Sequence, residues 1–515
     1  MRKRSRFLRC VATFISTLSA SIAFGVSHCA CLAIAIPPAG SGDFSRLTRA
    51  KDTEVFTPPR DPDAAVFQLR QLVRRTAAEH RKISIAGARH SMGGHTLING
   101  GLTVDMSSEA FRHIDRVKVV NGLSTVRVGA GTTWHELLAT LDRQGWSIAV
   151  MQSNDDFTVG GSISVNCHGW QPESPPIADT VQAFVLLRAD GSIVECRRDR
   201  ESDHELFSAV CGGYGLFGII LQVELRVVSN QLYKAQEFAA TAHNYAERYD
   251  SLIVHADQPV GLAYGRLSVA PGSWFLTDAR IIRFVPVDSK TGRVTNTIRE
   301  NGGEFSLRPN EITLARTVFR ASVGNSLGKL TRWSIERLHG QTHRTLSRNG
   351  ILQTPSDWFA NRDSSYVEIL HEYFVPPDRL ADFLTQTRSV LRKKDSADLL
   401  NVTIRKIKRD DLTMLAYARE DVFGLVMLFR YPATQEADGK MALTTQELIK
   451  AALDCHGSYY LPYRPHATLN EFRRAYPRYA AFLELKRKYD PEEVFENLFY
   501  LNYVRPAATQ IEWRP

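Results

Sequence analysis

The sequence predicts a protein that mixes helices with strands joined by hairpins. Two extended runs, 181–187 and 193–196, are separated by an Asp-Gly pair, which is typical of a hairpin turn. Further along, three extended runs at 365–375, 400–407 and 422–431 alternate with helical patterns. Strands interleaved with helices indicate a sheet that is covered on one face.

The composition indicates a globular protein of two or three domains. The chain has 515 residues, and 43% of them are hydrophobic, which is ample for a large core. The net charge of +9 is spread along the chain rather than gathered in a basic stripe with interleaved aromatic residues. We therefore expect no nucleic-acid partner. The seven cysteines form no C-x-x-C pair, so we expect no zinc site and no disulfide framework.

The N-terminus has the pattern of an export signal. Residues 1–36 combine a basic head with an uncharged run from Val11 to Ile36. Ala33-Ile-Ala35 is a cleavage-site pattern, but the run is also long enough to serve as an uncleaved membrane anchor. We expect an exported protein, periplasmic or extracellular, and favour a cleaved signal over an anchor. Residues 37–60 are polar and rich in proline, which indicates a linker.

The next elements are ordered as helix, loop, strands and helix. Residues 63–79 have apolar residues at helical spacing. A strand-turn-strand pattern occupies 111–128, and a helix is expected from Thr133 to Asp142, with Thr132 or Thr133 as its N-cap. A short helix follows the 181–196 hairpin at 203–210 and leads into a strand at 219–227.

The second half begins near Gln231. Strand patterns are expected at 260–269 and 274–282, followed by an irregular, basic region at 286–363 that suits either a lid or an interface helix segment. Between and after the last three strands, the spacing predicts helices at 377–394 and 445–455.

A glycine-rich stretch from Ile85 to Met106 links two of the early strand patterns. Five glycines lie in it, with Arg89, His90 and Ser91 among them. Glycine lets backbone N–H groups come close to a ligand and form an anion-binding nest. Taken alone, this stretch fits either an ordinary hairpin or a pyrophosphate loop with a histidine beside it.

A second glycine pattern excludes a nicotinamide cofactor of the Rossmann type. Residues 213–218 match G-x-G-x-x-G, but a helix pattern precedes them and a strand pattern follows. The Rossmann fingerprint needs the opposite order.

Five pieces in order carry a resemblance to a known family. They are Arg89-His90-Ser91, Val126-Arg-Val-Gly-Ala-Gly131, Thr158-Val-Gly-Gly161-Ser-Ile-Ser164, His168-Gly169 and 206–220. Together they resemble the flavin-binding half of the vanillyl-alcohol oxidase / p-cresol methylhydroxylase superfamily. The resemblance implies an α+β fold, with a two-subdomain FAD-binding domain of the p-cresol methylhydroxylase (PCMH) type at 61–230. It further implies an antiparallel-sheet substrate domain at 231–475 and a C-terminal return to the FAD domain at 476–515.

The resemblance also implies which residues hold FAD. The expected residues are Ala86, Gly87, Ala88, Arg89, His90, Ser91, Asp155, Thr158, Gly160, Gly161, Ser162, Ser164, His168, Gly169, Gly218, Ile219 and Ile220. His90 occupies the position at which related oxidases bond covalently to the flavin, so we expect FAD to be attached through His90. His95 falls outside the matched position, and we expect it to have a surface or loop role.

The substrate side resembles the sugar and polyol oxidases, decaprenylphosphoryl ribose oxidase and the lactone oxidases. This looser likeness rests on Glu372-Tyr-Phe-Val-Pro376 and on the tail that begins at Gly457. The candidate catalytic residues are Glu372, Arg405, Tyr460 and Tyr463. Since strand side chains alternate, Arg405 and Lys406 cannot both face the flavin, and we favour Arg405.

The resemblance therefore implies an FAD-dependent oxidoreductase that oxidises a CH–OH group of a sugar, polyol or lactone by hydride transfer to flavin N5. Its partners would be a small-molecule substrate and an electron acceptor: oxygen, quinone or cytochrome. Two alternatives stay open, namely CH–NH oxidation of the cytokinin-dehydrogenase type and a flavin-binding protein without turnover.

Overall fold

The computed structural model of the chain describes residues 42–287, 293–295, 297, 308–338, 345–356, 361, 363–393 and 397–506. The expected export signal at 1–36 lies outside these residues. Within the described ranges, no helix is long and apolar enough to cross a membrane.

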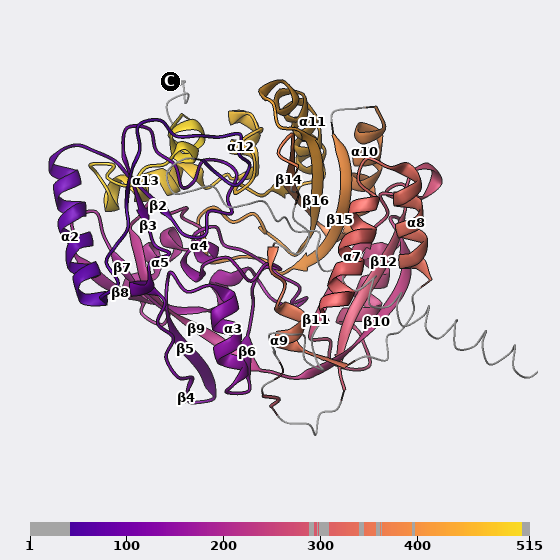
Figure 1. Ribbon diagram of the computed structural model, residues 1–515, viewed down its shortest axis with the longest axis horizontal. Coiled ribbons are helices and arrows are strands. Elements are labelled where there is room, and N and C mark those ends of the chain that lie inside the picture. Colours follow the sequence, from indigo (N-terminus) through magenta and orange to yellow (C-terminus); the bar gives the residue numbers. More distant parts are fainter. Residues whose placement is uncertain are drawn as a thin grey trace, which may run out of the picture.

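Two sheets build the N-terminal domain (Figure 1). The smaller sheet is parallel and has the order β1-β3-β2, with bounds Glu54–Phe56, Leu102–Asp105 and Ile83–Ala86. The larger sheet is antiparallel, has the order β4-β5-β9-β7-β8, and is joined by β6 through β9. Its strands are Lys118–Val120, Leu123–Gly129, Trp146–Ile148, Val181–Leu187, Ile193–Arg197 and Ile219–Ser229 for β4 to β9.

Four helices complete the described part of this domain: α2 (Pro62–Ala78), α3 (Trp134–Asp142), α4 (Val159–Ser164) and α5 (His204–Val210). Thr133 caps α3 in a reciprocal capping box with Glu136. Trp134, Leu137, Leu138 and Leu141 bury one face of α3, which fixes the chain that leads on to α4.

An eight-stranded sheet forms the second domain. Its order is β13-β10-β12-β11-β15-β16-β14-β17, and its recorded pairings are antiparallel. The strands are Leu232–Thr241, Leu262–Leu267, Asp278–Pro286, Thr345–Ser347, Tyr366–Val375, Asp398–Ile407, Val422–Pro432 and Ser458–Tyr459 for β10 to β17.

The two faces of this sheet have different neighbours. Helices α10 (Leu380–Lys393) and α11 (Gln435–Asp454) pack on the face that carries His371 and Tyr373, whose ring lies 5.8 Å from Phe383. The opposite face carries Glu368, Leu370 and Glu372, because strand side chains alternate.

Helices α7 (Pro309–Ala321) and α8 (Ser326–Arg337) cover one part of that opposite face. Arg320 of α7 pairs with Glu368, and Glu336 of α8 accepts from Arg266 at 3.1 Å. The remaining part of the face, around Glu372, is turned toward the N-terminal domain.

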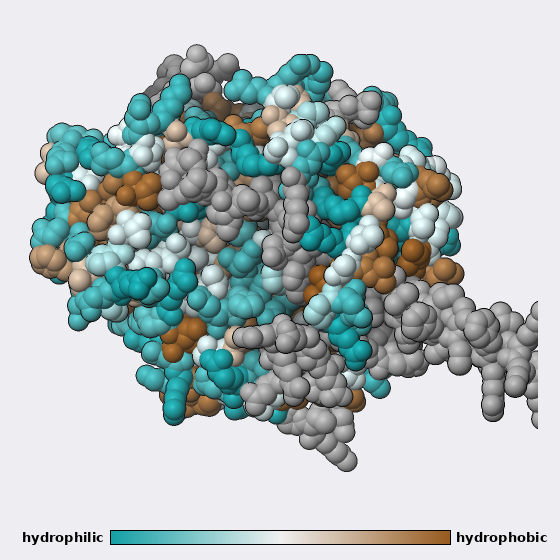
Figure 2. All heavy atoms as spheres, in the orientation of Figure 1, coloured by the Kyte–Doolittle hydropathy of each residue, from teal (hydrophilic) through white to brown (hydrophobic). Residues whose placement is uncertain are grey.

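The C-terminal helices α12 (Leu469–Ala475) and α13 (Tyr479–Tyr489) lead the chain back to the N-terminal domain. The amide of Ile83 donates to Val494 at 2.7 Å, and the amide of Leu498 donates to Gly94 at 3.2 Å. On the face shown in Figure 2, polar residues predominate among the coloured atoms, and the apolar ones are scattered.

Several elements match the sequence predictions closely. The helix at 63–79, the hairpin β7–β8 and the three strands β14, β15 and β16 are confirmed within about two residues. The expected strand at 111–120 is wrong for most of its length: Glu109–Phe111 is a 3-10 turn, and β4 begins only at Lys118.

Two regions for which the sequence predicted no definite element also contain regular structure. The basic region at 286–363 contains the regular helices α7 and α8. The expected linker at 37–60 contains β1, and Asp43, Phe44 and Ser45 are fully buried in it. Strand β10 was not predicted, and α11 begins about ten residues before the expected start at Thr445.

Candidate active site

A cavity lies between the N-terminal domain and the eight-stranded sheet. Its lining comes from four places: the glycine loop, α4 with the chain before it, strands β14 to β16, and residues 460–463. The lining thus runs from the glycine loop to the sheet, which brings the expected cofactor residues and the expected catalytic residues to one cavity.

The glycine loop presents free backbone donors to this cavity. Within the described chain, the amides of Ala88, Arg89, His90 and Ser91 donate to no other group of the protein. Arg89 has a φ of 57°, and its guanidinium donates to Asp105 at 2.8 Å, which fixes the loop. Successive N–H groups around a left-handed residue form an anion-binding nest. This loop therefore fits a pyrophosphate.

Close backbone packing explains why glycine is required beside the loop. A Cβ on Gly87 would lie 2.2 Å from the Thr158 Oγ1, and one on Gly160 would lie 2.9 Å from the Ala130 Cβ. Thr158 caps α4 and accepts from the Gly161 amide at 3.3 Å. Loop and helix thus form one rigid wall whose shape side chains would disrupt.

His90 lies in an aromatic sandwich on this wall. Its ring stacks on Phe157 at 4.0 Å, and Phe44 lies 4.8 Å away on another side. The Nε2 atom is buried and lies 3.7 Å from Asp156 Oδ2. Burial lowers the pKa of His90 below its ordinary value, so the imidazole is neutral at neutral pH.

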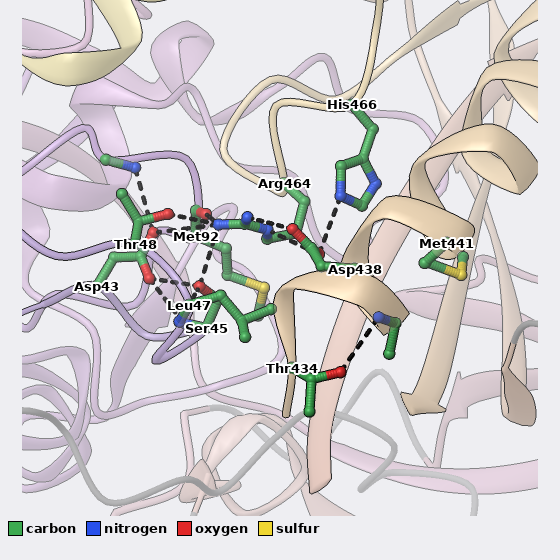
Figure 3. A network of polar contacts seen from close by, with 12 residues as sticks. Asp43, Ser45, Leu47, Thr48, Met92, Thr434, Asp438, Met441, Arg464 and His466 are labelled. Carbon is green, nitrogen blue, oxygen red and sulfur yellow. Dashed lines mark hydrogen bonds and ion pairs between the residues drawn. The ribbon is translucent and has the colours of Figure 1, made fainter. Parts of the chain in front are cut away.

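Phe44 belongs to an N-terminal segment that Arg464 links to α11. This strap, residues 42–49, is bound by Arg464, whose guanidinium donates to Ser45, Thr48 and Asp438 (Figure 3). The amide of Phe44 also donates to Ser91 at 3.1 Å. The strap thus closes one side of the cavity over the glycine loop.

A buried acid and a histidine meet on the sheet side of the cavity. Glu372 on β14 is 3% exposed, and its Oε1 lies 2.8 Å from His168 Nε2. His168 is presented by a tight turn in which Asn166 has a φ of 51° and donates to Asp410 at 2.9 Å. Glu372 also accepts from the Tyr463 hydroxyl, at 3.4 Å.

Arg405 on β15 places a positive charge on the sheet side of the cavity. It is 5% exposed and donates to Ser153 Oγ at 2.6 Å, while its buried Nε has no partner in the described chain. Lys406 lies on the other face, 3.9 Å from Asp421 and 5.1 Å from the Phe423 ring centroid. The prediction that only Arg405 faces the cavity is confirmed.

Tyr460 has a structural role in the cavity wall rather than a role in proton transfer. Its hydroxyl donates to the Val165 carbonyl at 2.8 Å, and burial raises its pKa well above the ordinary value. Tyr463 also lines the cavity, where its hydroxyl points at Glu372.

The structure brings most of the expected site residues to the cavity. The four candidate catalytic residues line it, as do Gly87, Ala88, Arg89, His90, Ser91, Thr158, Gly160, Gly161, Ser162, Ser164, His168, Gly218 and Ile220. Ala86, Asp155, Gly169 and Ile219 do not line it. Asp155 is fully buried and bonds to His135 of α3 at 2.9 Å, so its side chain points away.

Other lining residues were missed by the sequence analysis. They include Phe44, Met92, Gln152, Ser153, Leu370, Val426 and Pro462. Leu370 and Val426 could have been found from the strand alternation that selects Glu372. Phe44 carries no such signal, because no periodic pattern surrounds it.

His95 lies in a loop, one of the two roles expected for it, but it is not on the surface. It is 5% exposed, lines the cavity and stacks on Phe499 at 4.5 Å. Burial lowers its pKa to about 3. The ring therefore joins the glycine loop to the C-terminal segment as a neutral aromatic group.

The described residues contain no group of three or more His, Cys, Asp or Glu side chains that could hold a metal ion. Cys167, Cys196, Cys211 and Cys455 are buried free thiols. Cys167 lines the cavity, and burial raises its pKa to about 12, so it is an uncharged wall residue.

Comparison with known proteins agrees with this geometry. A family model for an FAD binding domain matches residues 65–197, the region of the glycine loop and α4. Cytokinin dehydrogenase 7 of Oryza sativa subsp. japonica is 26% identical over 493 residues, covering 88% of this chain and 87% of that protein.

Two further relatives match over a shorter region. L-gulonolactone oxidase of Mus musculus is 25% identical over 187 residues, covering 36% of this chain and 41% of that protein. An uncharacterized oxidoreductase, ORF5 in the fasciation locus of Rhodococcoides fascians, is 30% identical over 189 residues, covering 36% of this chain and 40% of its own.

Proposed function

We propose that this chain, as an FAD-dependent oxidoreductase of the vanillyl-alcohol oxidase / p-cresol methylhydroxylase superfamily, oxidises a CH–OH group of a sugar, polyol or lactone. The observation that carries this proposal is the pair of buried side chains, Glu372 and Arg405, on one wall of the cavity.

The residues present fit FAD. The free amides from Ala88 to Ser91 suit its pyrophosphate, and the cavity runs from this loop to the sheet that carries Glu372 and Arg405. When bound, FAD supplies the atom that accepts the hydride.

Glu372 is the group best placed to take the substrate's hydroxyl proton. Its carboxylate lines the cavity, lies 2.8 Å from His168 Nε2 and accepts a hydrogen bond from Tyr463. A base held in this way contributes about 10²–10⁴-fold to a rate. His168 Nε2, 2.8 Å from the carboxylate, would relay the proton onward.

Arg405 favours an alcohol as the substrate. Removing a proton and a hydride from CH–OH builds negative charge on oxygen, and a buried guanidinium stabilises that charge in a low-dielectric site. Oxidation of CH–NH builds positive charge on the carbon–nitrogen unit, which the same cation disfavours. Its unpartnered Nε gives Arg405 a donor to spare.

CH–NH oxidation is the second candidate. Its support is the match to a cytokinin dehydrogenase across 88% of this chain, whereas the gulonolactone oxidase match covers 36%. A panel of sugars, polyols, lactones and alkylamino-purines, mixed anaerobically with the protein, separates the two. We expect the visible flavin absorbance to bleach with members of the first three classes. Bleaching by the amines alone would overturn the CH–OH proposal.

We also propose that FAD is bonded covalently to His90 and that the chain is exported. His90 lines the cavity with a neutral imidazole, and acid-denatured protein should retain its yellow flavin. The basic and apolar run at 1–36 supports export, to be checked by N-terminal sequencing of the secreted protein. Repeating turnover with oxygen, a quinone dye or cytochrome identifies the electron acceptor.

A further inference from the structure

His90 can turn only one of its two ring nitrogens toward a cofactor. The imidazole is clamped between Phe157 and Phe44, and its Nε2 is a buried atom without a hydrogen bond in the described chain. Nε2 faces Asp156 at 3.7 Å. Nδ1 is therefore the nitrogen left for a bond to the flavin.

Asp156 is held where it can serve this histidine. Ser356 donates to its Oδ2, the same oxygen that faces His90. The adjacent acid has a different partner, because Asp155 bonds to His135 of α3. Two neighbouring carboxylates thus point to two different imidazoles, and only one of those imidazoles lines the cavity.

We propose that Asp156 positions His90 and accepts its Nε2 proton while the covalent bond to FAD forms. This inference rests on the covalent attachment proposed above. A carboxylate opposite Nε2 selects the tautomer with a proton on Nε2 and a lone pair on Nδ1, and it stabilises the imidazolium that attack produces. A distance of 3.7 Å is an ion-pair distance that shortens as that charge develops.

The attachment balances with oxygen as the oxidant. The Nδ1–C8α bond forms, one C–H bond of the 8α-methyl breaks, and its proton leaves. The Nε2 proton passes to Asp156, so the linked imidazole ends neutral. The flavin takes up the two electrons, and dioxygen reoxidises it to give hydrogen peroxide.

The test measures attachment rather than turnover. Wild-type protein and the variants D156N, D156E and D155N are each prepared without flavin and incubated with FAD in air. The mass of the denatured protein then reports the adduct of one FAD over time. We expect the adduct to form at least tenfold more slowly in D156N, and to recover in D156E. D155N should form it at the wild-type rate, because Asp155 faces His135.

To show that each variant folds, binding of FAD before attachment is measured by the quenching of FAD fluorescence. S356A, which leaves Asp156 in place but removes its anchor, should slow the adduct less than D156N does. Equal rates in D156N and wild type would overturn the role of Asp156 while leaving covalency intact. H90A should bind FAD without forming the adduct. If wild-type protein behaves in the same way, the covalent attachment is wrong, and this inference is wrong with it.

Discussion

Glu372 is buried in a cavity whose other walls are largely backbone and apolar side chains; its carboxylate lies 2.8 Å from His168 Nε2 and accepts from the Tyr463 hydroxyl. Another acid, Glu368, lies four residues earlier on the same face of β14 but pairs with Arg320 outside the cavity. Comparing variants of Glu372 and Glu368 therefore distinguishes a role in the reaction from the structural effect of losing a buried acid on this strand.

Replacing Glu372 by Gln should lower kcat about 10²–10⁴-fold, because the amide keeps the shape but cannot take a proton. Binding of FAD should be unchanged. Steady-state kinetics with a dye acceptor measure the loss, with E368Q as the matched control that retains turnover. If E372Q keeps its kcat, Glu372 is not the base.

Asp43 should give the protein a local pH dependence. Burial raises the pKa of its carboxyl from 3.8 to about 6 in the folded state. Between these values the folded protein binds more protons than the unfolded chain, so this contribution to stability is full below pH 3.8 and is lost as pH rises to 6. At about 1.4 kcal/mol per pKa unit, the loss is about 3 kcal/mol.

In D43N the fall in unfolding free energy with rising pH that Asp43 contributes should disappear. Urea denaturation at several pH values between 4 and 7 measures it as the difference in unfolding free energy between D43N and wild type. D52N, an exposed acid of the same segment, should keep the wild-type slope. A D43N protein with an unchanged slope would contradict the assignment to Asp43.

At the scale of elements, strand β15 places two cations on opposite sides of the sheet. Arg405 reaches Ser153 across the cavity, whereas Lys406 lies beside Asp421. We expect R405A to lower kcat about 10²–10³-fold, the cost of losing one charge-stabilising donor. K406M should leave kcat within about threefold of wild type. A larger loss of kcat in K406M than in R405A would mean that the strand register or the proposed role of Arg405 is wrong.

The strap at 42–49 depends on Arg464, which links it to Asp438 of α11 (Figure 3). The Arg464 side chain is 9% exposed, so removing its guanidinium leaves the nearly buried carboxylate of Asp438 with fewer partners. R464M should cost about 3 kcal/mol of stability and speed hydrogen exchange at the amides of the strap. R49M, on the exposed end of the same strap, is the control. Exchange that stays slow in R464M would show that the other contacts of the strap, such as Phe44 with Ser91 and Arg46 with Tyr366, hold it without Arg464.

On the scale of the whole molecule, the C-terminal segment braces the glycine loop. Lys486 is fully buried, pairs with Asp490 and donates to the carbonyls of Leu216 and Phe495. From there the chain continues to Leu498, whose amide donates to Gly94. A segment about 400 residues away in sequence thus shapes the loop that fits the pyrophosphate.

Because the Lys486–Asp490 pair is buried, breaking it should cost about 3–5 kcal/mol. K486M and D490N should each lower the urea midpoint, and the double variant should lose less than the sum of the two. Strict additivity would show that the two side chains do not depend on one another. Exposed K488M provides the control.

How far the sequence predicts this protein depends on whether a signal is local. The helix at 63–79 and the strands β14 to β16 were predictable, since their periodic burial is written in consecutive residues. Helices α7 and α8 were missed because their exposed charges hide a narrow apolar stripe at Ala315, Phe319 and Trp333. Proline at N1 of α7 and Asn325 as the N-cap of α8 were the available signals.

The sequence by itself determined the glycine loop, the position of His90 beside it and that only one of Arg405 and Lys406 can face the cavity, since spacing and strand alternation are local properties. Only the tertiary structure decided that Phe44, Asp156 and Phe157 surround His90, and that Glu372 meets His168. Asp155 and Asp156 are adjacent and alike in sequence, yet they face different histidines. Such pairings depend on how separate elements pack in space, which no spacing along one chain can encode.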